Sequence, residues 1–128
     1  MRGRAASRSD RGQAAVELAL VLPVVLLLVL AALQVGLVAR DVVLVQHAAR
    51  EAARAAAVDG DVSRIRAAAV EGSGLPADRL EVTVSARGEP GTTVTVTVRY
   101  RSPTDVPLAG ALVADRVLDA SATMRVER

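Results

Sequence analysis

Cysteine is absent from this 128-residue chain, and aromatic residues are almost absent, since Tyr100 is the only one. A chain without cysteine has no disulfide framework and no thiolate metal site. Because aromatic rings usually supply the largest single burials in a core, any folded part must pack with small aliphatic side chains instead. The length leaves room for one small domain. We therefore expect a small domain whose core consists mainly of Ala, Val and Leu.

Residues that carry out catalysis or bind metal ions are also scarce. His47 is the only histidine, and although Glu51 lies one helical turn away, a zinc site needs three or more protein ligands. No G-x-S-x-G nucleophile elbow occurs, and the stretch Gly72-Ser73-Gly74 is too short for a phosphate-binding loop. The sequence therefore predicts a protein that is not an enzyme, with no catalytic residue, metal ligand, cofactor or small-molecule substrate.

Lysine is missing too, so all sixteen basic residues are arginine. Arg2, Arg4, Arg8 and Arg11 lie within the first twelve residues, where Asp10 is the only acidic residue. The rest of the chain has 12 Arg against 13 Asp or Glu, a net charge of −1. The isoelectric point near 10.3 therefore comes from the N-terminal leader (residues 1–12) rather than from a basic surface suited to nucleic acid. We expect no nucleic-acid partner.

A long stretch without charge follows the leader. Leu18 to Ala39, the apolar run, contains 22 residues, mostly Leu and Val. As a helix it spans about 33 Å, enough for a hydrocarbon core about 30 Å thick. Pro23 lies in its first turns, where a missing N–H is less costly than in the middle. We expect one transmembrane helix, and because basic flanks stay in the cytoplasm, the C-terminal part should lie outside.

The helical pattern continues past the apolar run. Apolar residues recur at three- and four-residue steps at Val42, Val45, Ala49, Ala52, Ala53 and Ala56, while Arg40, His47, Arg50, Glu51 and Arg54 fall on other faces. One helix is therefore expected from about Ala14 to Val58. Asp59-Gly60-Asp61 supplies a stop and a new N-cap. A shorter helix is predicted from Val62 to about Val70, with Val62, Ile65 and Ala69 on one side.

Period-two alternation then predicts three strands. Apolar residues alternate with polar ones at Leu80, Val82, Val84 and Ala86, at Val94, Val96, Val98 and Tyr100, and at Leu118, Ala120, Ala122, Met124 and Val126. Gly88 to Gly91 should form the first turn, Ser102 to Pro107 a loop, and Leu108 to Ala114 a short helical turn. A long helix, a short helix and a small three-stranded antiparallel sheet make an α+β fold.

The most informative stretch joins the leader to the apolar run. Gly12 is followed by Gln13-Ala14-Ala15-Val16-Glu17, and the apolar run begins at the next residue. A carboxylate in lipid is penalised by up to about 2.5–3.5 kcal/mol at the bilayer centre and by less near the interface. Gln13 and Glu17 are one helical turn apart and share a face. Glu17 therefore needs a partner.

This stretch resembles the class III leader of type IV pilin-like proteins, which has a glutamate at the fifth mature position. Together with Ala48-Ala49-Arg50-Glu51-Ala52-Ala53-Arg54-Ala55-Ala56, it resembles TadE-like minor pseudopilins of the tight-adherence (Flp) pilus system, and the actinobacterial members most. The resemblance covers residues 11–58. It implies that a prepilin peptidase cuts after Gly12 to free Gln13, and that Glu17 pairs with the freed amine of a neighbouring subunit.

Two departures distinguish the chain from a major Flp pilin. Leu18 stands where the major pilins commonly carry Tyr, and the part beyond residue 58 is larger than theirs. Both departures favour a minor component over the shaft subunit. The resemblance thus implies a cytoplasmic leader (1–12), a transmembrane and extended helix (13–58) and a small extracytoplasmic domain (59–128). The implied partners are the membrane, prepilin peptidase and other pilin or pseudopilin subunits.

Other interpretations stay open. One alternative is that Gly12 and Glu17 coincide by chance on an ordinary signal anchor whose extracytoplasmic domain binds a ligand or wall polymer. Alternatively, Leu18 to Leu30 serves as the apolar region of a secretory signal cut after Ala31. The secretory interpretation leaves the apolar residues 32–39 on the mature N-terminus and gives Glu17 no role.

Overall fold

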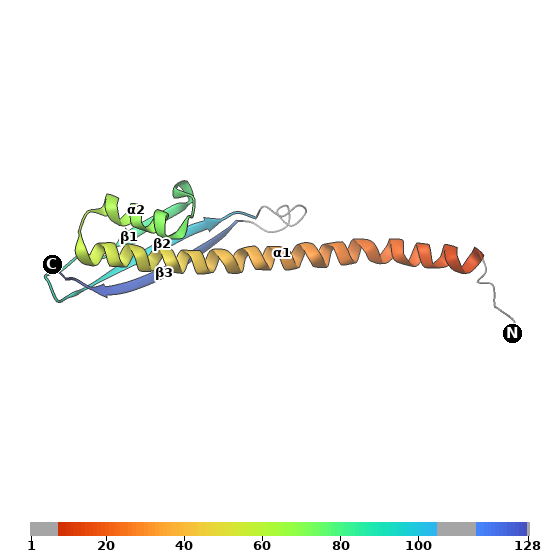
Figure 1. Ribbon diagram of the computed structural model, residues 1–128, viewed down its shortest axis with the longest axis horizontal. Helices are drawn as coiled ribbons and strands as arrows, with labels where there is room; N and C mark the ends of the chain where they lie inside the picture. The colour runs from red at the N-terminus through yellow and green to blue at the C-terminus, as the bar shows by residue number, and fades with distance from the viewer. Residues whose placement is uncertain (1–7, 105–114, 128) are drawn as a thin grey trace.

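A computed structural model describes residues 8–104 and 115–127 of the chain (Figure 1). Its elements are α1 (Arg8–Val58), α2 (Val62–Ser73), the 3₁₀ turn η1 (Ala77–Arg79), β1 (Leu80–Val84), β2 (Thr93–Ser102) and β3 (Arg116–Arg125). The two helices and three antiparallel strands confirm the predicted α+β fold. The predicted helical turn from Leu108 to Ala114 lies outside the described residues.

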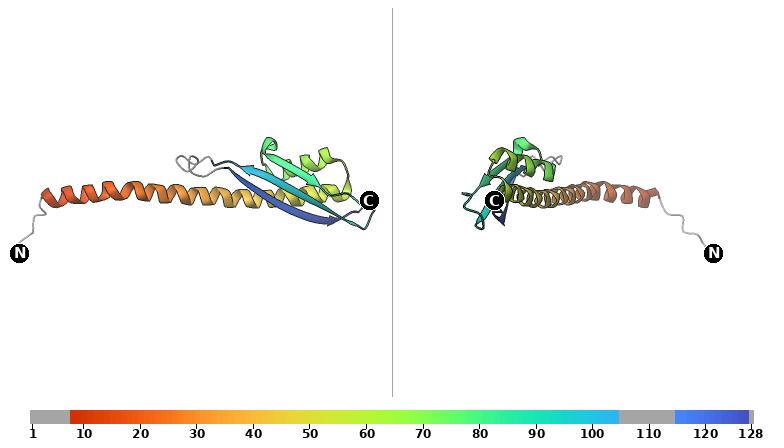
Figure 2. Two further views of the ribbon diagram at one scale, coloured as in Figure 1. Left: turned by 180° about the vertical axis from the view of Figure 1, so that it is seen from behind. Right: turned by 60° about the vertical axis from the view of Figure 1, so that its left-hand side comes forward.

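Helix α1 dominates the shape of the molecule (Figures 1 and 2). It has 51 residues and begins six residues before the expected start at Ala14, so the end of the leader is helical. The N-terminal part projects away from the rest of the protein, and its large apolar side chains are exposed, for example Leu20 at 71% and Leu28 at 65%. An apolar helix that its own chain leaves uncovered needs another apolar environment.

The second half of α1 packs against the sheet and α2. Its buried residues are almost all alanine, at Ala48, Ala49, Ala52, Ala53 and Ala56, with Val45 at the near end. Because alanine adds little beyond the helix backbone, these positions let the sheet and α2 approach α1 closely. Ile65 and Ala69 of α2 complete this side of the core.

The three strands form a meander in the order β1-β2-β3. The central strand contributes most of the sheet's core, with Val94, Val96, Val98 and Tyr100 buried in alternation. Its opposite face is polar: the hydroxyls of Thr95 and Thr123 are 2.8 Å apart and those of Thr97 and Ser121 are 2.9 Å apart. The predicted strand pattern is therefore correct, although β1 ends before Ala86 and β2 extends through Ser102, which we expected in a loop.

Two apolar positions expected in the core are instead exposed, Val42 at 38% and Val62 at 58%. In α1 the buried stripe passes through Asp41 and Val45, so Asp41 and not Val42 faces the sheet. Val62 is the first residue of α2 and lies beyond the packed part of that helix. The spacing of apolar residues predicts which face of a helix is buried. It does not predict which of two adjacent residues lies at the edge of that buried face.

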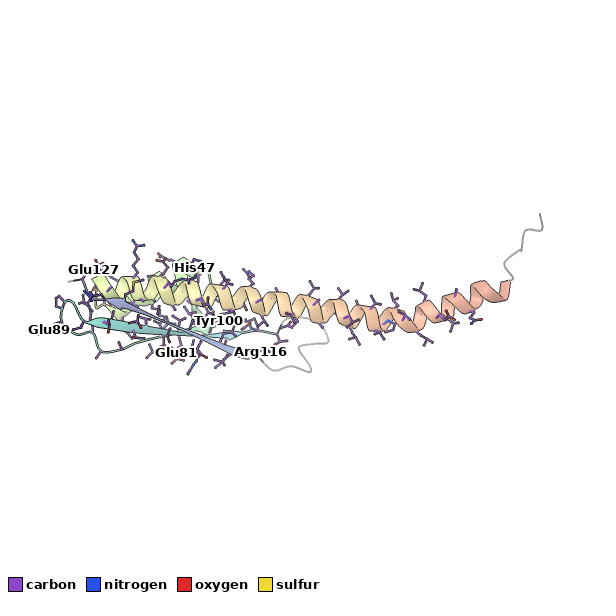
Figure 3. All side chains as sticks on the ribbon, turned by 90° about the horizontal axis from the view of Figure 1, so that it is seen from below. His47, Glu81, Glu89, Tyr100, Arg116 and Glu127 are labelled. Carbon is purple, nitrogen blue, oxygen red and sulfur yellow. The ribbon has the colours of Figure 1, made fainter. Side chains whose placement is uncertain are left out.

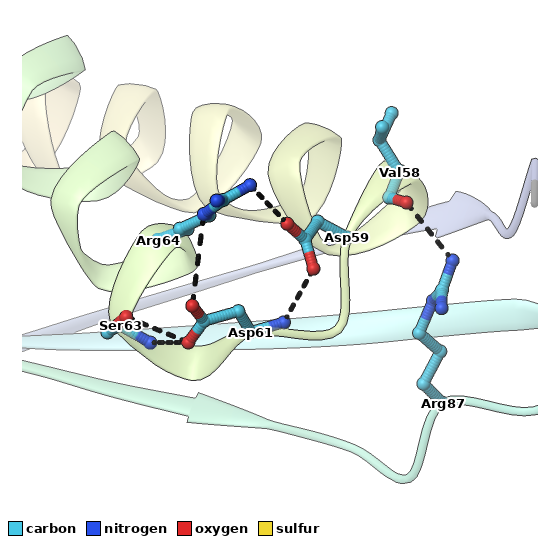
Figure 4. Close-up of polar contacts among 6 residues, drawn as sticks. All are labelled: Val58, Asp59, Asp61, Ser63, Arg64 and Arg87. Atoms are coloured by element: carbon cyan, nitrogen blue, oxygen red, sulfur yellow. Dashed lines mark hydrogen bonds and ion pairs between the residues drawn. The ribbon is translucent and has the colours of Figure 1, made fainter.

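The connection between α1 and α2 is held by polar contacts (Figure 4). Asp61 caps α2 by accepting a hydrogen bond from the Ser63 backbone N–H at 2.9 Å, as the sequence predicted. Arg64 bridges to Asp59 at 2.8 Å. The last carbonyls of α1 accept hydrogen bonds from Arg87, whose Nη2 lies 3.4 Å from the Val58 oxygen. These contacts satisfy groups that helix ends otherwise leave without partners.

Helix α2 packs tightly against Glu51 of α1 at Gly72. A Cβ built there would lie 2.6 Å from Cγ and 3.0 Å from Cβ of Glu51, distances that no ordinary packing allows. Helix α2 then ends at Ser73, three residues later than expected, and Gly74 adopts the left-handed conformation (φ 68°) that terminates it.

Candidate functional site

The residues that the sequence identified as the processing and assembly site lie near the start of α1. Gln13 Nε2 donates a hydrogen bond to Glu17 Oε1 at 3.2 Å, and both side chains are exposed. Gly12 precedes them within the same helix, and a Cβ built on it would meet no atom within 4 Å. Among the described residues, no other segment of the chain covers the helix surface at Gly12.

Among the described side chains, Glu17 is hydrogen-bonded only to the neutral amide of Gln13. Within residues 12–104 and 115–127, whose side chains the structure describes, the ion pairs involve Arg40 or Arg64 and none reaches Glu17. The Gln13 amide satisfies one lone pair of the carboxylate but supplies no positive charge. Since the apolar run begins at Leu18, this carboxylate lies at the boundary between polar and apolar helix surface.

The apolar run itself has the properties of a membrane span. In α1 an 18-residue window has a mean hydropathy of 2.9, and none of it is buried within the protein. By length and composition this helix could cross a membrane, and a core helix of a soluble protein would be mostly covered instead. The part of the chain that the structure describes therefore contains one helix long and apolar enough to cross a bilayer.

Other residues considered from the sequence are not gathered into a site. His47 lies exposed on the part of α1 beside the sheet (Figure 3), and Glu51 packs against α2 at Gly72. Among the described residues no three His, Cys, Asp or Glu side chains are grouped closely enough to hold a metal ion. Ser73 is used structurally, because its Oγ donates to the Ala69 carbonyl at 2.7 Å.

A polar cluster that sequence reasoning missed lies where the apolar run ends. Asp41 is only 9% exposed, and its Oδ2 accepts a hydrogen bond of 2.6 Å from Ser102 Oγ at the end of β2. Asp41 Oδ1 lies 4.0 Å from Arg40 Nη1. The position of Asp41, four residues before the buried Val45, was the available signal, since it falls on the stripe that faces the sheet.

Tyr100 lies next to this cluster on β2, and the pKa of its phenol is shifted. Burial raises the pKa of Tyr100 above its usual 10.0, and the negative charge of Asp41 raises it further, although Arg79 and Arg40 partly oppose the shift. The phenol therefore stays protonated at neutral pH and can act as a hydrogen-bond donor at this end of the domain.

Comparison with known proteins gives one finding at the same helix. Residues 12–54 match the model of a family described as TadE-like protein. Neither the comparison with curated proteins nor that with solved structures found a match. The matched region contains Gly12, Gln13, Glu17, the apolar run and most of the alanine-rich half of α1, so the similarity falls on the segment from which the sequence resemblance was drawn.

Proposed function

We propose that this chain, a TadE-like protein by the match over its long helix, is a membrane-anchored minor pseudopilin. It acts in the assembly of a Flp/Tad-type pilus or a related secretion apparatus and has no catalytic activity of its own. Helix α1 inserts in the cell membrane with the leader in the cytoplasm, and the sheet and α2 lie outside. Its partners are prepilin peptidase and other pilin or pseudopilin subunits.

The observation that carries this proposal is the environment of the Glu17 carboxylate. The carboxylate lies at the edge of an exposed apolar helix, and its partner, Gln13, is neutral. Burying an unpaired carboxylate in lipid or between helices is costly, whereas pairing it with a cation offsets much of that cost. Cleavage after Gly12 creates a new positive charge, the α-amine of Gln13. The amine of a neighbouring subunit is then a suitable partner for Glu17.

The local structure also suits processing after Gly12. The glycine lies near the start of α1, and no other part of the described chain covers it. Helix ends open locally at little cost, so a peptidase can reach this bond without unfolding the packed domain. Substitutions at Gly12 should for the same reason leave the fold intact.

Replacement of Glu17 tests the assembly role. Glu17→Gln keeps the shape of the side chain and removes its charge. We expect the variant to be processed and inserted normally but to lose crosslinking to neighbouring subunits and to lose the appendage from the cell surface. Glu71→Gln, which removes an exposed carboxylate from α2, is the matched control and should assemble as the wild type does. Normal assembly of the Glu17 variant would contradict the proposal.

A further inference from the structure

A groove of about 350 Å³ lies beside α1 at the point where its apolar run ends. One side is formed by Leu37, Arg40 and Leu44 of α1, and the other by Leu75, Arg79 and Tyr100, which come from the loop after α2, from η1 and from β2. The hydrogen bond from Ser102 to Asp41, which also lines the groove, joins β2 to α1 here. The groove is therefore a built feature of the junction between helix and domain.

The position of the groove along α1 is defined by the sequence. Leu37 belongs to the apolar run, and Arg40 is the first charged residue after it. At about 1.5 Å per residue these two positions are about 4.5 Å apart along the helix. The polar layer on each side of a bilayer is about 5–7.5 Å thick, since the hydrocarbon core of about 30 Å lies within about 40–45 Å in all. A groove from Leu37 to Arg79 thus crosses the boundary between acyl chains and headgroups.

Along α1 the lining passes from apolar Leu37 to charged Arg40 and then, further from the apolar run, to apolar Leu44. Leu37, Leu44 and Leu75 give apolar contacts, whereas both arginines have exposed side chains. Arg40 is 69% exposed, and its ion pair with Asp41 is long, at 4.0 Å. Within the described residues Arg79 makes no ion pair. Two guanidinium groups and one carboxylate leave a net charge of +1 at the groove, and guanidinium groups bind phosphate oxygens in pairs.

We propose that this groove binds one anionic phospholipid of the surrounding membrane. The phosphate contacts Arg40 and Arg79, and the first part of an acyl chain lies along Leu37 toward the apolar run. A phospholipid offers a negative charge next to an apolar chain, just as Arg40 follows Leu37 at the end of the apolar run. The apolar helix of a second subunit would leave the two arginines facing apolar surface.

This inference rests on the proposed insertion of α1 in the membrane. The bound lipid would hold the base of the domain at a fixed height, because its phosphate contacts both α1 and η1. It would thereby restrict the tilt of the sheet relative to the membrane.

The single aromatic residue makes the groove directly observable. Tyr100 lines it and is the chain's only tyrosine, with no tryptophan present, so its fluorescence reports on this place alone. The full chain is reconstituted in phosphatidylcholine vesicles that carry a small, equal fraction of brominated phosphatidylglycerol or brominated phosphatidylcholine, since bromine quenches a nearby fluorophore. We expect several-fold stronger quenching by the brominated phosphatidylglycerol.

Paired variants separate a bound lipid from general attraction. Arg40→Gln with Arg79→Gln should abolish the preference for phosphatidylglycerol, and Arg54→Gln with Arg125→Gln, at the opposite end of the domain, should retain it. In about 1 M salt, where the Debye length is about 3 Å, diffuse attraction is screened but direct contact remains. The wild-type preference should therefore persist in high salt.

Three outcomes would overturn the inference: equal quenching by the two lipids, an unchanged preference in the Arg40/Arg79 variant, or loss of the preference in high salt. Protection of Tyr100 from both lipids, with crosslinking between subunits at Leu44, would instead identify a second subunit as the occupant. Extraction of the vesicles with alkaline carbonate separates this failure from that of the proposed function. Release of the wild type would refute membrane anchoring itself, whereas retention without lipid preference would refute only the groove.

Discussion

Ser102 donates a buried hydrogen bond of 2.6 Å to Asp41, a residue 61 positions earlier in the chain. The bond joins the end of the central strand to the first turn of α1 after the apolar run. It therefore sets where the sheet begins along the helix, and with it the distance between the domain and the end of the apolar run. The alanines further along α1 allow the close approach, and this polar contact fixes its position.

Removal of the Ser102 hydroxyl should destabilise the domain. Ser102→Ala leaves one oxygen of a buried carboxylate without its donor, a change that costs about 1–3 kcal/mol. Thermal unfolding of the full chain in detergent, followed by the near-ultraviolet circular dichroism of Tyr100, measures the loss. Ser121→Ala, which removes an exposed hydroxyl hydrogen-bonded to Thr97, is the control and should cost less. Equal losses would show that the bond to Asp41 has no special part.

A methyl group at Gly72 should separate the two helices. Gly72→Ala places a Cβ 2.6 Å from Cγ of Glu51, and overpacking of this kind typically costs about 1–3 kcal/mol. Gly36→Ala adds the same group to open space on α1 and should leave the domain's unfolding temperature unchanged. Glu51→Ala combined with Gly72→Ala should restore part of the loss, because the Cγ contact is removed. An unaltered unfolding temperature for Gly72→Ala alone would contradict the observed packing.

Ionisation of Tyr100 should weaken the fold in alkali. Its pKa in the folded protein lies above 10.0 because of burial first and the charge of Asp41 second. The unfolded chain therefore loses this proton at lower pH than the folded chain does. The contribution to stability is complete below about pH 10 and is lost as the pH rises through the folded pKa. Ultraviolet titration of the tyrosinate should give a midpoint above that of the unfolded chain, and Tyr100→Phe should remove the alkaline loss that this group causes.

The cap of α2 should contribute an acid-sensitive part of the stability. Hydrogen bonds from Ser63 lower the pKa of Asp61 below 3.8, and Arg64 lowers it further. The unfolded chain thus binds a proton here at higher pH than the folded chain. The contribution is present above about pH 4 and is lost as the pH falls through the folded pKa. Asp61→Asn keeps a capping side chain but removes the titrating carboxyl group. Between pH 5 and pH 3, which lie on each side of the usual carboxyl pKa of about 3.9, the unfolding temperature of this variant should fall less than that of the wild type. Parallel curves for the two proteins would contradict this assignment.

Much of the fold could be predicted because it depends on patterns that repeat along the chain. The alternating residues of β2 and the apolar run of α1 give the element types directly. The contacts that position the elements depend on pairs far apart in sequence. The sequence placed Ser102 in a loop and did not single out Asp41, and only the folded register brings them together. Gly72 lies beyond the expected end of the short helix near Val70, whereas in the structure it is part of α2 and lets Glu51 pack against that helix.

In the candidate sites, too, the sequence predicts the residues that are close along the chain but not those that folding brings together. Gly12, Gln13 and Glu17 lie close in sequence, so their arrangement on one helix follows from spacing alone, and the 3.2 Å contact between Gln13 and Glu17 agrees with it. The groove beside Tyr100 joins residues of α1, η1 and β2. No local sequence pattern predicts such a site, because its two arginines are far apart in the sequence and come together only when the sheet packs on the helix.

The identity of the mature N-terminus tests the central claim most directly. Mass spectrometry of the protein purified from its native cell envelope should find a chain that begins at Gln13, and Gly12→Val should retain residues 1–12 while Gly3→Val is processed normally. A natural, functioning protein that retains the arginine-rich leader would contradict the account, because Glu17 would then have no released amine to meet. A chain that begins at Ala32 would contradict it equally and establish a secretory signal instead.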